Sequence, residues 1–345
     1  MAADVFEFSW LVPQAGYHWH KAQVWRNDGP DPRAMTERSR LDDEPQWVLT
    51  EGLTVGQEFR RKRYAPLKDF PALFRTLADV DTGKQEAILS FANRFGYLGV
   101  PRPCHIQGSP QTALPVSGET HEEWIGQVEY LRRGLAIWDL LKAGDKLGLA
   151  RCIRWRERQY GPEGLVLNEG GWIYDSHPEL PVGKPMPHPG RTEELIEPVA
   201  DLFQDGDVTM PALFLVQRWI NKHLKAKVNP HLLYNLDTGQ QVLQVVPLTL
   251  LSATWLQFAQ AIAGNREQRA CKECGAWFEV SSRDDGRTAR RLFCSDACKS
   301  RDYRRGPKMP QRSMKSARKS GHRGATPKTM TTIKKPLRPK KKGRK

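Results

Sequence analysis

Four cysteines near the end of the chain have the spacing of ligands to a single metal ion. Two residues separate Cys271 from Cys274, nineteen residues follow, and three separate Cys294 from Cys298. Thiolates two or three residues apart can bind one tetrahedral ion without straining the backbone, and Zn²⁺ in structural sites takes four such ligands. Because four thiolates leave no coordination position open, a hydrolytic site is not expected. We therefore predict one structural Zn²⁺.

Two other interpretations of these thiols remain open. A Cys-x2-Cys pair can be a redox site, and four cysteines can also be unrelated to one another. The second pair lies where a helix is expected to begin, which favours a metal site over either alternative. Cys104 and Cys152 are isolated in the sequence, and we interpret them as small buried or incidental thiols.

The residues that follow the first pair predict a tight turn and a hairpin. Gly275, directly after Cys274, permits the positive φ that such a turn often needs. Residues 276–280 alternate in the manner of a strand, residues 281–288 are polar and predict a turn, and residues 290–293 predict the partner strand.

The second pair predicts a helix that begins at the metal site. Ser295 and Asp296 are suited to capping a helix, which would run through Cys298 to Arg305 and end before Pro307. A tight turn, a hairpin and a helix in this order are the layout of a treble-clef zinc finger. So short a segment cannot bury enough surface to fold alone, so the metal takes the place of a core. We refer to residues 271–306 as the finger.

The finger resembles the CGNR-type zinc fingers found at the C-terminus of bacterial transcription regulators. The shared residues are the Cys-x2-Cys pair followed by Phe278, the pair Arg290 and Arg291, Phe293 before Cys294 and Ser295, and Arg301 three residues after Cys298. In this chain Lys-Ser-Arg follows Cys298, where the family has Gly-Asn-Arg. The resemblance implies a zinc finger and a role in binding DNA.

The charge of the chain is concentrated in its last part. The net charge is +15, but residues 301–345 hold eighteen Lys and Arg and one acid, Asp302. The first 300 residues are therefore close to neutral. Residues 307–345, which we call the tail, contain no aromatic residue and few aliphatic ones, so we expect the tail to be disordered. The asymmetry indicates a polyanionic partner, most simply nucleic acid.

Within the finger, basic side chains are expected on both the hairpin and the helix. Such groups can contact phosphates or lie in a groove of nucleic acid. The residues that we predict to contact nucleic acid are Arg287, Arg290, Arg291, Lys299, Arg301, Arg304 and Arg305.

The body, residues 1–264, is predicted to be α+β and mostly helical. Apolar residues at helical spacing predict helices near 67–80, 85–95, 121–142, 192–203, 211–224 and 247–262. A hairpin is expected around the sequence DTGQ. Residues 26–46, 100–120, 176–191 and 264–270 are predicted to be irregular.

These features favour a zinc-binding, nucleic-acid-binding regulator, with DNA favoured over RNA and a possible protein partner for the body. A protein-interaction module that binds nucleic acid incidentally is a second hypothesis. An enzyme with an unrecognised active site in residues 1–264 is a third. With neither an export signal nor an apolar run that could cross a bilayer, we expect a cytoplasmic protein, nucleoid-associated in a bacterium, and no membrane partner.

Overall fold

Helices and strands are both abundant in the computed structural model. It describes residues 8–27, 39–41, 45–51, 61–99, 101–106, 116–157, 159–162, 165–168, 171–176, 193–196, 206–235, 239–280 and 291–305. The helices are α1 (Pro66–Asp69), α2 (Leu73–Ala78), α3 (Gln85–Phe95), α4 (His121–Ala143), α5 (Lys146–Cys152), α6 (Thr209–Leu224), α7 (Leu250–Ala263) and α8 (Asp296–Arg305). The strands are β1 (Trp10–Pro13), β2 (Tyr17–Asn27), β3 (Ser39–Leu41), β4 (Gln46–Glu51), β5 (Arg61–Tyr64), β6 (Arg102–Ile106), β7 (Val116–Thr120), β8 (Ile153–Arg156), β9 (Gln159–Tyr160), β10 (Val166–Asn168), β11 (Gly171–Asp175), β12 (Glu193–Ile196), β13 (Val228–Asn235), β14 (Gln240–Pro247), β15 (Glu267–Ala270) and β16 (Trp277–Val280).

The mixed α and β character predicted for the body is confirmed, whereas a mostly helical body is not. Strands of the described body form several small antiparallel sheets beside the helices. No helix in the described parts of the chain is both long and apolar enough to span a bilayer.

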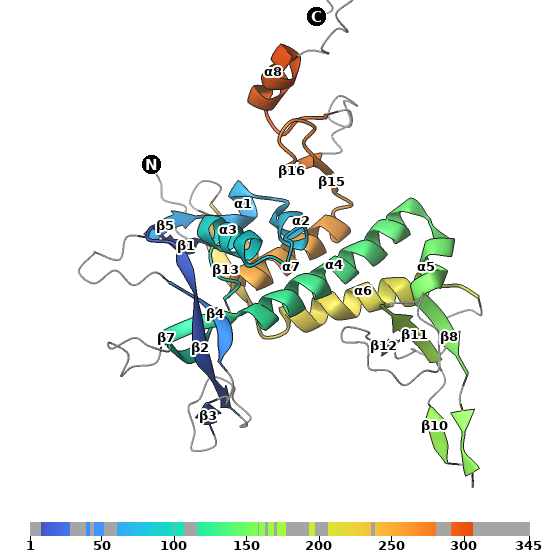
Figure 1. The fold of residues 1–345 in the computed structure, drawn as a ribbon. Helices are drawn as coiled ribbons and strands as arrows, with labels where there is room; N and C mark the ends of the chain where they lie inside the picture. The colour runs from blue at the N-terminus through green and yellow to red at the C-terminus, as the bar shows by residue number, and fades with distance from the viewer. Residues whose placement is uncertain are drawn as a thin grey trace, which may run out of the picture.

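A ring of four antiparallel strands forms one end of the body (Figure 1). β2 pairs with β4, β4 with β7, β7 with β6, and β6 again with β2. A small apolar cluster of Ala22, Val24, Val48 and Cys104 is buried there. β7 approaches β4 so closely that position 118 must be glycine, because a Cβ there would lie 2.4 Å from a methyl carbon of Val48.

The main core lies among α2, α4, α6 and α7, which pack side by side in the middle of the molecule (Figure 1). Three fully buried tryptophans, Trp124, Trp219 and Trp255, come from three of these helices. α4 begins at a reciprocal capping box between Thr120 and Glu123, which satisfies two backbone donors. It ends at Ala143, with Gly144 as the C-cap at a φ of +65°, close to the end of the helix predicted at 121–142.

A three-stranded sheet of β12, β11 and β8 packs beside α6. One prediction for this region was wrong. Part of the segment 192–203, predicted as a helix, is the strand β12 instead. β12 pairs with β11 along its whole length, and the Glu194 carboxylate accepts a 2.8 Å hydrogen bond from the Trp219 indole of α6. These distant partners outweigh the local helix preference of Glu and Leu.

Three segments predicted to be irregular contain strands, and one of them, residues 264–270, contains β15. Residues 100–120 include β6 and β7, and residues 26–46 include the end of β2, all of β3 and the start of β4. Proline and glycine at these positions indicated loops, but antiparallel pairing accommodates Pro103 and Gly118 within the ring. Except for Ser176, the segment 176–191 lies outside the described residues.

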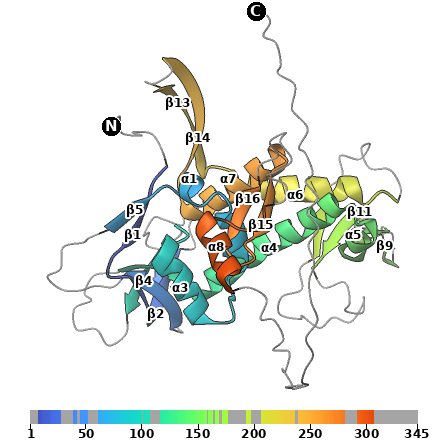
Figure 2. The same ribbon diagram turned by 90° about the horizontal axis from the view of Figure 1, so that it is seen from above.

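The predicted hairpin is confirmed as β13 and β14, which project from the body (Figure 2). Neither strand contains Asp, Glu, Lys or Arg. Leu232 lies opposite Leu243 on one face of the hairpin, and these side chains are 64% and 68% exposed. The hairpin thus presents an uncharged apolar face.

A buried histidine in the helical core gives a prediction for stability. The His223 ring stacks on Trp255 of α7 at 4.3 Å and meets the edge of Tyr130 of α4. Its Nε2 has no hydrogen-bond partner among the described residues. Burial, with smaller contributions from Lys227 and Lys222, lowers the pKa of His223 to about 4.

We expect this histidine to make the protein less stable in mild acid. Because the folded-state pKa is below the ordinary value of 6.5, the unfolded chain binds a proton first, so the free energy of unfolding falls from about pH 6.5 to pH 4. In the His223→Phe variant, which keeps the ring stack, about 2 kcal/mol of the loss between pH 7 and pH 5 should disappear. Urea unfolding of the wild type and the variant at pH 7 and pH 5 measures this difference. An equal loss of unfolding free energy in the two proteins would contradict the prediction.

Candidate metal centre

The strand β15 joins the last helix of the body to the finger. α7 ends at Ala263, and after three residues β15 pairs with β16 in a short antiparallel ribbon. α8 lies beyond this ribbon, away from the helical core (Figure 1). The helix predicted after Cys294 is confirmed, from Asp296 to Arg305.

The four cysteines predicted as ligands lie together. Their sulfur atoms are all within 4.8 Å of one another, and the sulfur of Cys294 is 3.6 Å from those of both Cys274 and Cys298. A tetrahedral zinc ion with bonds of about 2.3 Å holds its sulfurs about 3.8 Å apart, whereas a disulfide requires about 2.05 Å. All six cysteines are free thiols. The spacing therefore fits one metal ion and no disulfide.

Backbone contacts hold the first pair of cysteines in its turn. Gly275 has φ of +71°, as predicted, and its N–H donates to the Cys271 carbonyl at 2.8 Å. The N–H of Lys272 donates to the Leu292 carbonyl at 3.0 Å, which joins this turn to the segment before the second pair. The two halves of the site are thus connected through the main chain.

A serine cap positions the second pair. The Ser295 hydroxyl accepts a 3.3 Å hydrogen bond from the backbone N–H of Cys298, so the predicted cap is present. Cys298 and Cys271 are buried, Cys294 is half-buried and Cys274 is exposed. A metal bound here would have one side towards solvent.

The surroundings of the sulfurs shift the pKa of Cys271 and that of Cys294 in opposite directions. Burial opposes ionisation of Cys271, but backbone hydrogen bonds from Cys294, Cys274 and Glu273 outweigh it and lower the pKa of Cys271 to about 6. For Cys294, burial and the neighbouring thiols raise the pKa to about 12. Backbone donors thus favour a thiolate at Cys271, whereas a thiolate at Cys294 would need a neighbouring cation to stabilise it.

Three of the basic residues predicted to contact nucleic acid have partners within the finger. An Arg301 Nη atom lies 3.8 Å from the sulfur of Cys298, where its charge offsets that of a thiolate. The Arg291 guanidinium donates to the carbonyls of Phe293 and Cys294 at 2.9 and 2.6 Å. Arg305 forms a 3.0 Å ion pair with Glu273. These three side chains support the metal site and the turn.

The other predicted contacts are arranged differently. Lys299 and Arg304 are exposed on α8, and neither has an ion-pair partner among the residues that the structure describes. Arg287 and Arg290 lie outside those residues, as does the turn predicted at 281–288. The described finger therefore has two unpaired cations on the helix.

The hairpin of the finger differs from the prediction. β16 confirms the strand predicted at 276–280, but its partner is β15, in the segment 264–270 that was predicted to be irregular. Residues 291–293 are not a strand, because the Leu292 carbonyl accepts from Lys272 and the Phe293 carbonyl from Arg291. The prediction of a strand at 290–293 was therefore wrong for its described part.

A contact between the finger and the body was not predicted. The Trp277 indole N–H donates to the Asp79 carboxylate after α2, at 2.5 Å. The Arg75 guanidinium lies 5.4 Å from the centre of the Trp277 ring and forms a 2.6 Å ion pair with Asp139 of α4. This contact, about two hundred residues apart in sequence, fixes the ribbon of the finger against the helical core. Nothing in the local sequence could have indicated the pairing.

Comparisons of the chain with models of protein families, with curated proteins and with solved structures find no match. Function must therefore be argued from the site itself.

Proposed function

We propose that the four cysteines hold one structural Zn²⁺ and that the finger binds nucleic acid, with DNA favoured, as part of a regulator of the CGNR-like kind. The donor set supports zinc, because four sulfurs at tetrahedral spacing suit Zn²⁺ better than the oxygen-preferring cations. Arg301 would offset part of the negative charge that remains on a zinc ion with four thiolates.

The observation that carries the nucleic-acid proposal is the division of charge on α8. Arg301 and Arg305 have partners within the finger, on Cys298 and Glu273. Lys299 and Arg304 project from exposed positions of the same helix. Unpaired cations on a helix that is anchored at a metal site are suited to contacting phosphates. The basic tail, described here only by its sequence, would add contacts that do not depend on base sequence.

Removing the two unpaired cations tests this proposal. The salt dependence is measured as the slope of log affinity against log salt concentration. In the double variant Lys299→Ala, Arg304→Ala, we expect this slope to become less steep by about 2, because each lost phosphate contact lowers its magnitude by about 0.9. A labelled DNA fragment titrated with the full chain at several salt concentrations gives the slope.

A matched control removes two exposed charges from the body. Lys146 and Arg151 are exposed on α5, and replacing both by alanine lowers the net charge equally. We expect this variant to retain the slope of the wild type. Equal slopes for the two double variants would contradict the proposal and favour the protein-interaction alternative, in which the finger contacts a protein.

A further inference from the structure

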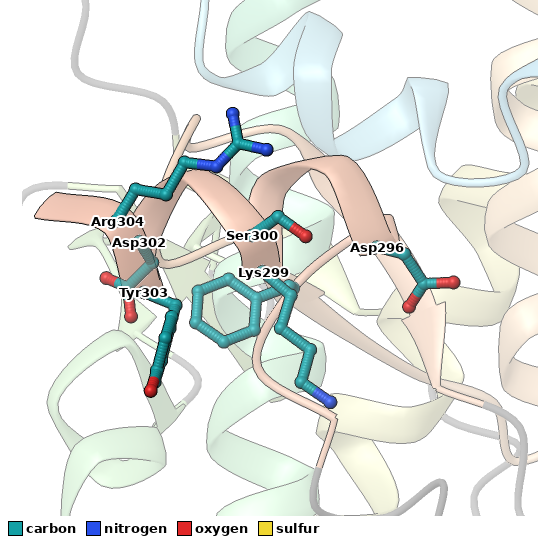
Figure 3. Close-up of a pocket in the computed structure, with 7 residues that line it drawn as sticks. Asp296, Lys299, Ser300, Asp302, Tyr303 and Arg304 are labelled. Carbon is teal, nitrogen blue, oxygen red and sulfur yellow. The ribbon is translucent and has the colours of Figure 1, made fainter.

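A hollow on α8 combines aromatic, cationic and acidic groups (Figure 3). The side chains that matter for the argument are Phe293, Asp296, Lys299, Asp302, Tyr303 and Arg304. Tyr303 and Lys299 point the same way from the helix, and Arg304 points the other way (Figure 3). The hollow is open to solvent and lies on the described part of the finger.

Tyr303 is the most exposed large hydrophobic side chain in this region, at 87% exposed. It is four residues after Lys299, one helical turn away, so the two side chains share a face of α8. Phe293, which is half-buried, adds an apolar ring to the lining of the hollow. An aromatic ring that protrudes beside a cation is the arrangement on which bases of single-stranded nucleic acid stack.

The acids of the hollow argue against a phosphate directly above it. Asp296 and Asp302 both line the hollow, and Asp302 is 3.7 Å from Lys272, so its charge is only partly offset. A duplex backbone over these carboxylates would meet like charge. The amino groups of adenine, cytosine and guanine, by contrast, donate hydrogen bonds that a carboxylate accepts.

We propose that this hollow binds one unpaired base of a single-stranded nucleic acid. The base would stack on Tyr303 and donate an amino hydrogen to Asp296 or Asp302, while Lys299 and Arg304 contact the phosphates on either side. This inference rests on the proposed nucleic-acid binding by the same finger and narrows it to a substrate class. Bases that carry an amino group are preferred over thymine.

The test uses the full chain and short single strands of deoxyadenosine, deoxycytidine or thymidine, at a salt concentration of about 0.2 M to weaken contacts made by charge alone. Tyr303→Ala should weaken binding to the first two by roughly tenfold or more. Tyr303→Trp should restore it, because tryptophan also stacks. Each variant is first assayed for zinc, which separates a lost contact from a lost fold.

A matched control is Tyr160→Ala, which removes another exposed tyrosine, 61% exposed on β9, and should leave binding unchanged. A strand that carries 2-aminopurine adds a direct readout, because stacking on Tyr303 quenches its fluorescence. We expect the wild type and Tyr160→Ala to quench the 2-aminopurine fluorescence, and Tyr303→Ala to leave it unquenched.

The outcomes separate this inference from the proposed function. The base site is wrong if duplex and single strands bind equally, or if Tyr303→Ala binds like Tyr160→Ala. In either case the proposed function stands, provided that Lys299→Ala, Arg304→Ala still weakens binding. If Lys299→Ala, Arg304→Ala has no effect on either substrate, both are wrong. Thymidine strands that bind as tightly as the others contradict the role of the two acids.

Discussion

Replacing Cys298 by serine should release zinc from the protein and unfold the finger. Cys298 is buried, its backbone N–H donates to the capping Ser295 hydroxyl, and its sulfur lies 3.6 Å from that of Cys294. Since so short a segment has little core of its own, we expect a bound metal to supply most of the free energy that folds it. In zinc-finger peptides, metal binding contributes on the order of 10 kcal/mol. Cys298→Ser should therefore destabilise the finger more than any substitution on its surface does.

Two measurements check this expectation together. Metal analysis should find about one zinc per wild-type chain and none in Cys298→Ser. Hydrogen exchange should show that the amides of β16 and α8 lose protection, whereas those of α4 and α7 keep it, because the helical core has its own buried tryptophans.

Cys152→Ser is the matched control, since Cys152 is a half-buried thiol of α5 that lies outside the cluster. It should retain both zinc and the protection of the finger. If Cys298→Ser also retains them, the metal site is wrong and the cluster is a group of incidental thiols. A protein that holds no zinc and forms a reversible disulfide between two of these cysteines when an oxidant such as oxidised glutathione is added would instead favour the redox alternative.

Deleting the tail should produce the second large effect, a much weaker dependence of binding on salt. Residues 307–345 contain fifteen Lys and Arg and no acid. If six to ten of them neutralise phosphates, the full chain should lose about 10³ to 10⁵ in affinity between about 50 and 200 mM salt. A chain that ends at residue 306 should retain only the shallow slope of the finger. Titrations of labelled DNA at several salt concentrations measure both slopes.

The control for this deletion keeps the length of the tail and replaces its Lys and Arg by Gln. Because the expected effect comes from charge, the replaced tail should behave like the deletion. A replaced tail that keeps the wild-type slope would mean that the chain itself, and not its charge, contributes to binding. Equal slopes for the full and shortened proteins would exclude the tail as a phosphate contact.

The parts of the finger that were predicted correctly depend on neighbours in the sequence. The short spacing within each cysteine pair, the positive φ of Gly275 and the Ser295 cap each depend on residues within a few positions of one another, and only nineteen residues separate the two pairs. α4 was equally clear, because its apolar spacing lies within one continuous segment, predicted as 121–142. Its capping box was found only in the structure.

Several errors occurred where a distant partner decides the conformation. β6 closes the ring by pairing with β2, which precedes it by about eighty residues. One error is local instead, because β15, which is separated from β16 by six residues, takes the position that the sequence assigned to residues 290–293. The contact of Trp277 with Asp79 joins segments 198 residues apart. Pairings of this length leave no periodic signal in either segment.

Charge alone also could not separate the roles of the basic residues in the finger. Arg291 and Arg301 looked like Lys299 and Arg304 in the sequence, yet the first two have partners at the metal site. Tyr303 gives no signal in the sequence, because one tyrosine in a basic helix forms no distinctive pattern. Its importance comes from its exposure beside Lys299.

The most direct test of a metal-organised nucleic-acid site is the affinity of the chain ending at residue 306 for single-stranded DNA, before and after zinc removal. Removing the metal with a chelator should abolish binding, because Lys299, Tyr303 and Arg304 then lose the helix that positions them, and added zinc should restore it. Equal affinities with and without zinc would contradict the account.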